Sequence, residues 1–172
     1  LQIKIQQPAF LFEGTAISDS ERYKYPLMTL SEAKSKDDAK FLVLFFSGGK
    51  DSCFNMMKAV EHGHEIVVLA NLCPQDAKEQ ELDSFCFQTV GHNVVHAIAE
   101  AMELPLVRRQ FSGVAVVKEL HYATPTVDDE VEDLYELLLQ VKREYPQVEA
   151  VSCGAILSTY QRLRVESVCS RL

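Results

Sequence analysis

The six-residue string SGGKDS, from Ser47 to Ser52, has the groups needed to bind a polyphosphate. It lies between an apolar run and a helical pattern, where the free amides and the positive end of a helix attract anions. Gly48 and Gly49 permit positive φ and close backbone approach, so that successive N–H groups can turn toward phosphate oxygens. The two serine hydroxyls would add hydrogen bonds, and Lys50 would add a full positive charge. The loop therefore predicts a nucleotide-phosphate site.

The residue types of this loop exclude two other nucleotide-binding motifs and leave one structural alternative open. A Walker A loop needs Ser or Thr directly after its lysine, but here that position holds Asp51. The dinucleotide-binding fingerprint needs a third glycine that opens the helix, and none is present. A plain strand-to-helix turn, with Asp51 or Ser52 as the helix cap, stays open as an alternative.

Several other positions are candidates for ligand contacts. Asn71 and Gly154 each lie at the end of an apolar run, and open α/β sheets bind ligands beyond the carboxyl ends of their strands. We expect contact with adenosine at both, although such residues also serve in ordinary turns. Arg162 and Arg164 would bind a phosphate or carboxylate through paired hydrogen bonds, and an ion-paired or solvated arginine is the common alternative.

Acidic and imidazole side chains gather in two further segments. An expected helix begins with Asp129, Glu130, Glu132 and Asp133. The helix dipole stabilises such carboxylates without any function, and a functional role would be to ligate Mg²⁺ or to recognise a cationic group. His92 and His96 are four residues apart, but a third metal ligand is not evident, so packing or surface roles are favoured.

Alternating strands and helices are expected to position these groups. Short apolar runs predict strands over 41–46, 65–70, 105–109 and 149–153, and longer patterns predict helices over 52–62, about 82–102, 129–145 and 159–172. This order is typical of an α/β fold with a parallel sheet and helices on both faces. Ser158 and Gln161 are spaced as a capping box at the start of the last helix.

Length, charge and cysteine usage restrict the class of protein. The 172 residues suit one main domain, expected over 41–172 after an irregular extension over 1–40. A net charge of -8 disfavours nucleic acid as a partner, and no apolar run approaches the roughly 20 residues of a membrane span. Five cysteines without a CxxC pair favour a reduced, cytoplasmic protein.

SGGKDS after an apolar strand resembles the pyrophosphate-loop motif of ATP-pyrophosphatases, which have an adenine-nucleotide alpha-hydrolase-like fold. The resemblance implies that the loop, including Asp51, holds the β- and γ-phosphates of ATP while a nucleophile attacks the α-phosphorus and pyrophosphate leaves. Mg²⁺ is expected to assist, with ligands that the sequence does not identify. Catalytic roles are implied for Lys50, Asp51, Arg162 and Arg164.

Four further strings resemble the diphthine ammonia ligase family: LANL at 69–72, QTVGH at 88–92, DEVEDLYELL at 129–138 and GAILSTYQRLRVESVC at 154–169. The family resemblance implies a ligase that forms a carbon-nitrogen bond. ATP adenylylates the carboxylate of diphthine on translation elongation factor 2, ammonia forms the amide, and AMP and pyrophosphate leave. It also implies that the substrate cleft is bordered by Gln88, Thr89, His92, Glu130, Tyr160 and Gln161. Val127 and Asp128 depart from the family pattern, which usually has Glu and Gly there. The helical pattern continues to Leu172, whereas the family continues into a further C-terminal portion, so the resemblance implies that the domain over 41–172 is truncated at its C-terminus.

Two competing functions remain open from the sequence. One is an ATP-dependent transferase of the same loop class that acts on transfer RNA, although the acidic net charge and the lack of paired thiols weigh against it. The other is a non-catalytic module that binds and senses a nucleotide. No membrane partner is expected.

Overall fold

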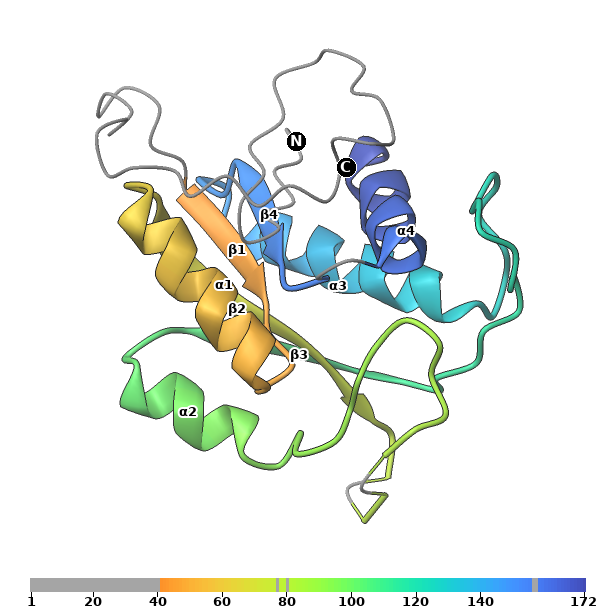
Figure 1. Cartoon of the computed structure of the whole chain (residues 1–172), viewed down its shortest axis with the longest axis horizontal. Coiled ribbons are helices and arrows are strands. Elements are labelled where there is room, and N and C mark those ends of the chain that lie inside the picture. Colours follow the sequence, from red (N-terminus) through yellow and green to blue (C-terminus); the bar gives the residue numbers. More distant parts are fainter. Residues whose placement is uncertain (1–40, 77, 80, 156–157) are drawn as a thin grey trace, which may run out of the picture.

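The computed structural model describes residues 41–76, 78–79, 81–155 and 158–172, and the extension expected over 1–40 lies outside them. The described residues form one parallel sheet of four strands in the order β3-β2-β1-β4 (Figure 1). Along the chain the elements are β1 (Phe41–Phe45), α1 (Lys50–Glu61), β2 (Glu65–Pro74), α2 (Val95–Ala101), β3 (Leu106–Phe111), α3 (Glu130–Glu144), β4 (Ala150–Cys153) and α4 (Thr159–Ser170).

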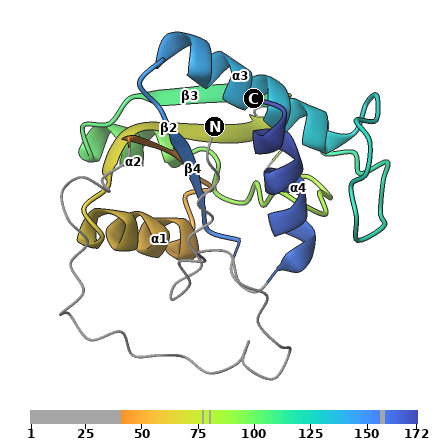
Figure 2. The same ribbon diagram turned by 90° about the horizontal axis from the view of Figure 1, so that it is seen from above.

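Helices cover both faces of this sheet, which confirms the predicted α/β architecture (Figure 2). Leu42 and Leu69 belong to a cluster on the face covered by α1 and α2, where Val95 and Ala99 are buried. On the other face Val43 and Val68 pack with the apolar stripes of α3 and α4. Successive residues of a strand point to opposite faces, so an almost continuous apolar run such as that of β1 fits a strand covered on both sides.

The helix predicted over about 82–102 is shorter in the structure, where only Val95–Ala101 is helical. Gly91 has φ +74 in the turn just before it, and the preceding backbone bonds to distant side chains instead of to its own carbonyls. β2 also runs to Pro74, four residues beyond its predicted end, because its last residues pair with β3. Both differences arise from contacts between segments that are far apart in the sequence.

Two of the helices, α3 and α4, begin with a side-chain cap. The carboxylate of Asp129 accepts from the amide of Val131 at the start of α3. Ser158 accepts from the amide of Gln161 at 3.3 Å, so half of the predicted capping box is present. The other half is absent, since the side chain of Gln161 donates to the carbonyl of Cys86 at 2.8 Å.

Asp128 has φ +64 just before α3. This backbone conformation favours glycine, which agrees with its place at a position where the family pattern has Gly. None of the described helices has the length and apolar character that a bilayer span requires.

Candidate functional site

The SGGKDS loop connects the end of β1 to the start of α1, as predicted. Gly48 has φ +83, and a Cβ there would lie 3.0 Å from Cγ2 of Val95 on α2. Gly49 is the N-cap residue of α1 and has an extended conformation with φ -83. Of the two glycines, only Gly48 therefore uses the positive φ that the sequence led us to expect. The backbone thus turns sharply once and then enters the helix.

The first turn of α1 offers its amides without a side-chain cap. No side chain bonds the helix start from Gly49, and the first amide with a helical acceptor is that of Cys53, which donates to the Gly49 carbonyl at 3.2 Å. Within the described part of the chain, the amides of Lys50, Asp51 and Ser52 have no acceptor. Such uncapped amides, together with the helix dipole, form an anion-binding position. The plain turn capped by Asp51 or Ser52 is therefore not the arrangement in this structure.

The hydroxyls and the lysine of the loop are arranged locally. The Ser52 hydroxyl donates to the Gly49 carbonyl at 2.8 Å, and its oxygen lies 3.3 Å from that of Ser47. The Gly49 amide in turn donates to the Ser47 oxygen at 3.4 Å. The Lys50 ammonium lies 3.4 Å from the Asp51 carboxylate, and the two side chains are 90% and 53% exposed. An exposed pair of this kind contributes little stability, so Lys50 is able to turn toward a bound anion.

A cavity of about 350 Å³ opens beside this loop. Its polar side is formed by the loop, and its other side by residues from the ends of β1 and β4, from α4 and from the segment after β2. The lining residues are Phe45, Ser47, Gly49, Lys50, Asp51, Ser52, Cys86, Phe87, Gln88, Cys153, Gly154, Ala155, Gln161 and Val165. The structure thus brings together much of the predicted phosphate loop, Gly154, Gln88 and Gln161, and leaves the other predicted site residues outside the lining.

Gly154 lies where the end of β4 meets the start of α1. A Cβ at Gly154 would be 3.2 Å from the carbonyl carbon and oxygen of Asp51 and from the amide nitrogen of Ser52. These are backbone atoms, so they cannot move aside as a side chain would. The glycine allows β4 to close the cavity against the amides of the loop.

Asn71, for which we predicted contact with adenosine, is turned into the protein instead. Its side chain is 2% exposed, its amide nitrogen donates to the carbonyl of Phe46, and its oxygen accepts from Nε of Arg108, both at 2.9 Å. Phe46 directly precedes the loop. Asn71 therefore fixes the backbone from which the loop starts.

Thr89 and His92 are buried and bond to the chain after β2. The Thr89 hydroxyl oxygen accepts from the amide of Leu82 at 2.8 Å, and Nε2 of His92 donates to the carbonyl of Glu79 at 2.9 Å. Neither lines the cavity. His96 is exposed and lies beside Glu100, so the two histidines do not form a shared site.

The two arginines predicted to be catalytic bond to protein groups. Arg162 forms an ion pair with Glu166 one turn along α4, at 2.7 Å. Arg164 is fully buried, with its guanidinium 3.3 Å from the ring centroid of Tyr160. It donates to the carbonyls of three residues between β3 and α3: Val117, Glu119 and Leu120. Tyr160 also donates to the Val117 carbonyl, so Tyr160 and Arg164 anchor a loop and neither lines the cavity.

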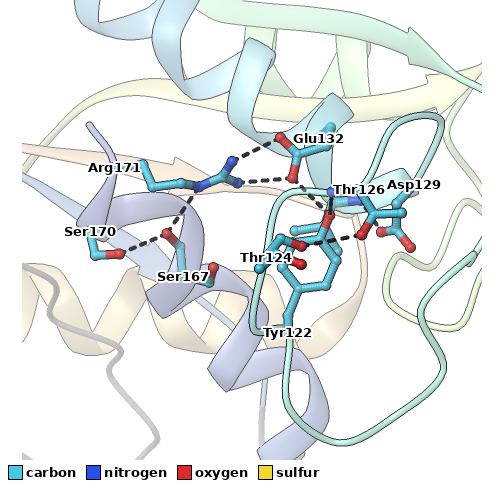
Figure 3. A network of polar contacts seen from close by, with 9 residues as sticks. Tyr122, Thr124, Thr126, Asp129, Glu132, Ser167, Ser170 and Arg171 are labelled. Carbon is cyan, nitrogen blue, oxygen red and sulfur yellow. Dashed lines mark hydrogen bonds and ion pairs between the residues drawn. The ribbon is translucent and has the colours of Figure 1, made fainter.

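The acidic residues at the start of α3 are also engaged with protein groups. The two oxygens of Asp129 accept from the amides of Val131, Val116 and Val117. Glu132 accepts from Tyr122 and forms a two-pronged ion pair with Arg171 (Figure 3). Glu130 accepts from Ser84 and Cys86. These carboxylates serve the fold, and neither Asp129 nor Glu132 is free for the metal or cation roles considered above.

The apolar side of the cavity was not predicted from the sequence. Burial raises the pKa of the Cys86 thiol and raises that of Cys153 to about 11, so both stay neutral at physiological pH and act as apolar lining. The rings of Phe45 and Phe87 meet edge to face with centroids 5.4 Å apart. The predicted strands over 41–46 and 149–153 contain Phe45 and Cys153. The places of these two lining residues at strand ends could therefore have been found from the sequence.

No group of three His, Cys, Asp or Glu side chains suited to a metal ion occurs among the described residues. Among the residues that line the cavity, Asp51 has the one carboxylate. Mg²⁺ in nucleotide sites is usually held by one or two carboxylates together with phosphate oxygens and water. The residues present thus fit a metal that arrives with a polyphosphate.

The sequence is similar to a described protein family and to several named proteins. A family model described as the diphthamide synthase N-terminal domain matches residues 39–172. A protein of Danio rerio named diphthine-ammonia ligase is 59% identical over 132 residues, which are 76% of this chain and 51% of that protein. Proteins of the same name from Homo sapiens and Schizosaccharomyces pombe are each 56% identical, over 47% and 20% of their length. The chain thus spans about half the length of some of these relatives and a fifth of others.

Proposed function

The chain belongs to the diphthamide synthase N-terminal domain family, and from that premise we propose that it forms the ATP site of a diphthine-ammonia ligase. In the proposed reaction the carboxylate of diphthine on translation elongation factor 2 attacks the α-phosphorus of ATP, and pyrophosphate leaves. Ammonia then attacks the adenylylated carbonyl, and AMP leaves as the amide forms. The observation that supports this function most directly is the row of uncapped amides at the start of α1, whose residues line the cavity.

The residues of the loop would bind and stabilise the departing pyrophosphate. The amides of Lys50, Asp51 and Ser52 donate to the β- and γ-phosphate oxygens, and the Lys50 ammonium turns from Asp51 to the same oxygens. The three backbone amides are in place before the reaction, so they stabilise the leaving charge without reorganisation. Mg²⁺, bound by the phosphates with Asp51, would supply further charge neutralisation.

The apolar side of the cavity would hold the uncharged part of the nucleotide. Phe45, Phe87 and Val165 offer apolar surface, and the thiols of Cys86 and Cys153 are kept neutral by burial. No side-chain nucleophile is needed, because bound orientation of the carboxylate and the α-phosphate supplies much of the acceleration in such reactions. The free cysteines fit a reducing compartment, and we place the reaction in the cytoplasm.

Isotope exchange between pyrophosphate and ATP, in the presence of diphthine-bearing elongation factor 2, tests the proposal. The protein should catalyse exchange and form the amide product when ammonium is present. Lys50→Ala should lower exchange by roughly tenfold or more, the loss of one charge-assisted contact in the transition state. Lys58→Ala is the matched control, since Lys58 lies on the same helix and pairs with Glu61.

A second candidate is a non-catalytic module that binds a nucleotide without turnover. The uncapped amides at the start of α1 favour it equally, because they account for binding of a nucleotide without requiring turnover. This module would bind ATP with no exchange in the assay above, and that result would reject the ligase.

A further inference from the structure

The segment 84–88, which we call the 84–88 wall, closes one side of the cavity without regular secondary structure. Cys86, Phe87 and Gln88 from this wall line the cavity. A loop of this kind needs partners for its backbone groups, since buried amides and carbonyls are costly when unpaired. The partners of the wall come from α3 and α4.

Glu130 on α3 bonds the wall through both of its carboxylate oxygens. Oε1 accepts from the amide of Cys86 at 2.9 Å, and Oε2 accepts from the hydroxyl of Ser84 at 2.6 Å. The Ser84 oxygen in turn accepts from the amide of Phe87 at 2.7 Å. One carboxylate thus orders the backbone of two residues that line the cavity.

Gln161 on α4 bonds the same wall from a different helix. Its side-chain nitrogen donates to the carbonyl of Cys86 at 2.8 Å. The amide and the carbonyl of Cys86 are therefore each held by a side chain, one from α3 and one from α4. The ring of Phe87 is fixed between those of Phe45 and Phe111, at centroid distances of 5.4 and 5.9 Å.

A buried carboxylate at this place is costly, so its retention needs a reason. Glu130 is 1% exposed, and burial raises its pKa while the neighbouring Asp129 charge adds to that rise. The bonds from Ser84 and Cys86 and the charge of Arg164 act in the opposite direction. An apolar residue at this position would avoid the desolvation cost of a carboxylate. Glutamate is explained by its two oxygens, which accept from two donors of the wall that would otherwise lack partners.

We propose that Glu130 and Gln161 are positioning residues that hold the 84–88 wall in the shape that receives the nucleotide, and that Glu130 does not touch substrate. This inference rests on the proposed ATP site and deepens it. The family resemblance had implied that both residues border the substrate, but of the two only Gln161 also lines the cavity.

Glu130→Gln tests the inference with almost no change in shape. The glutamine oxygen can still accept from Cys86, but its nitrogen then faces the Ser84 hydroxyl, which loses its acceptor. Gln161→Met keeps the length of the side chain, removes the donor to Cys86 and serves as the second variant should the first fold poorly. Glu136→Gln is the matched control, an exposed glutamate on the same helix.

Two measurements separate wall positioning from a general effect on stability. Amide hydrogen exchange reports opening of residues 85–88 relative to the amides of β1 and β2, and calorimetry reports the Kd of MgATP. We expect each wall variant to speed exchange at Cys86 and Phe87 by roughly tenfold and to weaken MgATP by a similar factor, with β1 and β2 unchanged. The control should match the original chain.

Unchanged exchange at Cys86 and Phe87 in both variants would overturn the inference, as would unchanged MgATP affinity in both. Faster exchange that extends equally over β1 and β2 would also overturn it, because the two residues would then act on the whole fold. Failure of the original chain to bind MgATP is a different result and would reject the proposed function.

Discussion

Gly154 and Gly49 border the same cavity under different steric constraints. A Cβ at Gly154 would meet backbone atoms of Asp51 and Ser52 at 3.2 Å, whereas one at Gly49 would lie 3.5 Å from the Ser47 oxygen, an ordinary contact. Neither glycine needs positive φ. The constraint at Gly154 is therefore close packing of β4 on the start of α1.

Gly154→Ala should lower the free energy of unfolding by about 1–3 kcal/mol, the usual cost of forcing one carbon into a packed site, and should weaken MgATP binding. Gly49→Ser is the control, since serine is a preferred N-cap residue and should leave stability equal or higher. Chemical denaturation measures both. Equal stability of Gly154→Ala and the original chain would show that β4 can move away from the loop without cost.

Several single residues could be predicted from the sequence only in part. The apolar run and the helical pattern on either side of the SGGKDS loop predicted its place between strand and helix. Its glycines, lysine and hydroxyls predicted a phosphate site, because such groups act locally. The direction of Asn71 and Arg164 was not predictable, since an amide or guanidinium bonds a phosphate and a protein carbonyl equally well. Their carbonyl partners, such as Phe46 and Val117, carry no side-chain signal for this contact.

At the scale of elements, the strands and the long helices followed from apolar patterns. The helix expected over 82–102 was largely wrong because the partners of its first half, Glu130 and Gln161, lie 44 and 75 residues away from Cys86. Periodicity detects partners within one helix turn and misses such contacts. For the same reason, the sequence did not predict that residues 84–88 form one wall of the cavity.

The ion pair between Glu132 on α3 and Arg171 after α4 links the two helices on one face of the sheet (Figure 3). Glu132 also accepts from Tyr122 at 2.8 Å, and Arg171 lies 4.6 Å from the ring centroid of Tyr135. Both charged side chains are about three-quarters buried, with exposures of 22% and 26%. We expect this pair to contribute more than an ordinary surface pair.

A double-mutant cycle with Glu132→Gln and Arg171→Met should give a coupling energy of about 1–2 kcal/mol, because the pair is two-pronged and partly desolvated. Arg162 and Glu166 provide the comparison within one helix, for which about 0.3–0.5 kcal/mol is expected. Denaturation at low and high salt measures both cycles. A coupling at Glu132 and Arg171 no larger than in the comparison would contradict the view that they join α3 to α4.

At the scale of the whole molecule, several acids are buried in their neutral forms. Burial raises the pKa of Cys153 from 9.0 to about 11 and that of Cys169 to about 12, and burial with a bond to Glu132 raises that of Tyr122 to about 12. The folded state holds these protons more tightly than the unfolded chain. The resulting stability is complete below pH 9 and is lost as pH rises through 11 to 12.

The free energy of unfolding should therefore fall between pH 9 and pH 11, with Cys153 alone contributing on the order of 2–3 kcal/mol. Cys153→Ala should lower the free energy of unfolding at every pH, because it leaves a cavity. It should also make the decline between pH 9 and pH 11 less steep. Val151→Ala on the same strand leaves a comparable cavity without a titrating group, so its decline should stay as steep as in the original chain. Denaturation at a series of pH values compares the slopes, and parallel curves for both variants would contradict the assignment to Cys153.

The strand order also determines when the site can form during folding. β1 lies between β2, its next strand along the chain, and β4, which starts more than a hundred residues later. Parallel pairing between such distant segments is slow, because the entropy cost of closing a long loop comes before any stabilising hydrogen bond forms. A nucleotide in a refolding mixture should therefore be captured only with the slowest phase, when β4 docks and completes the cavity.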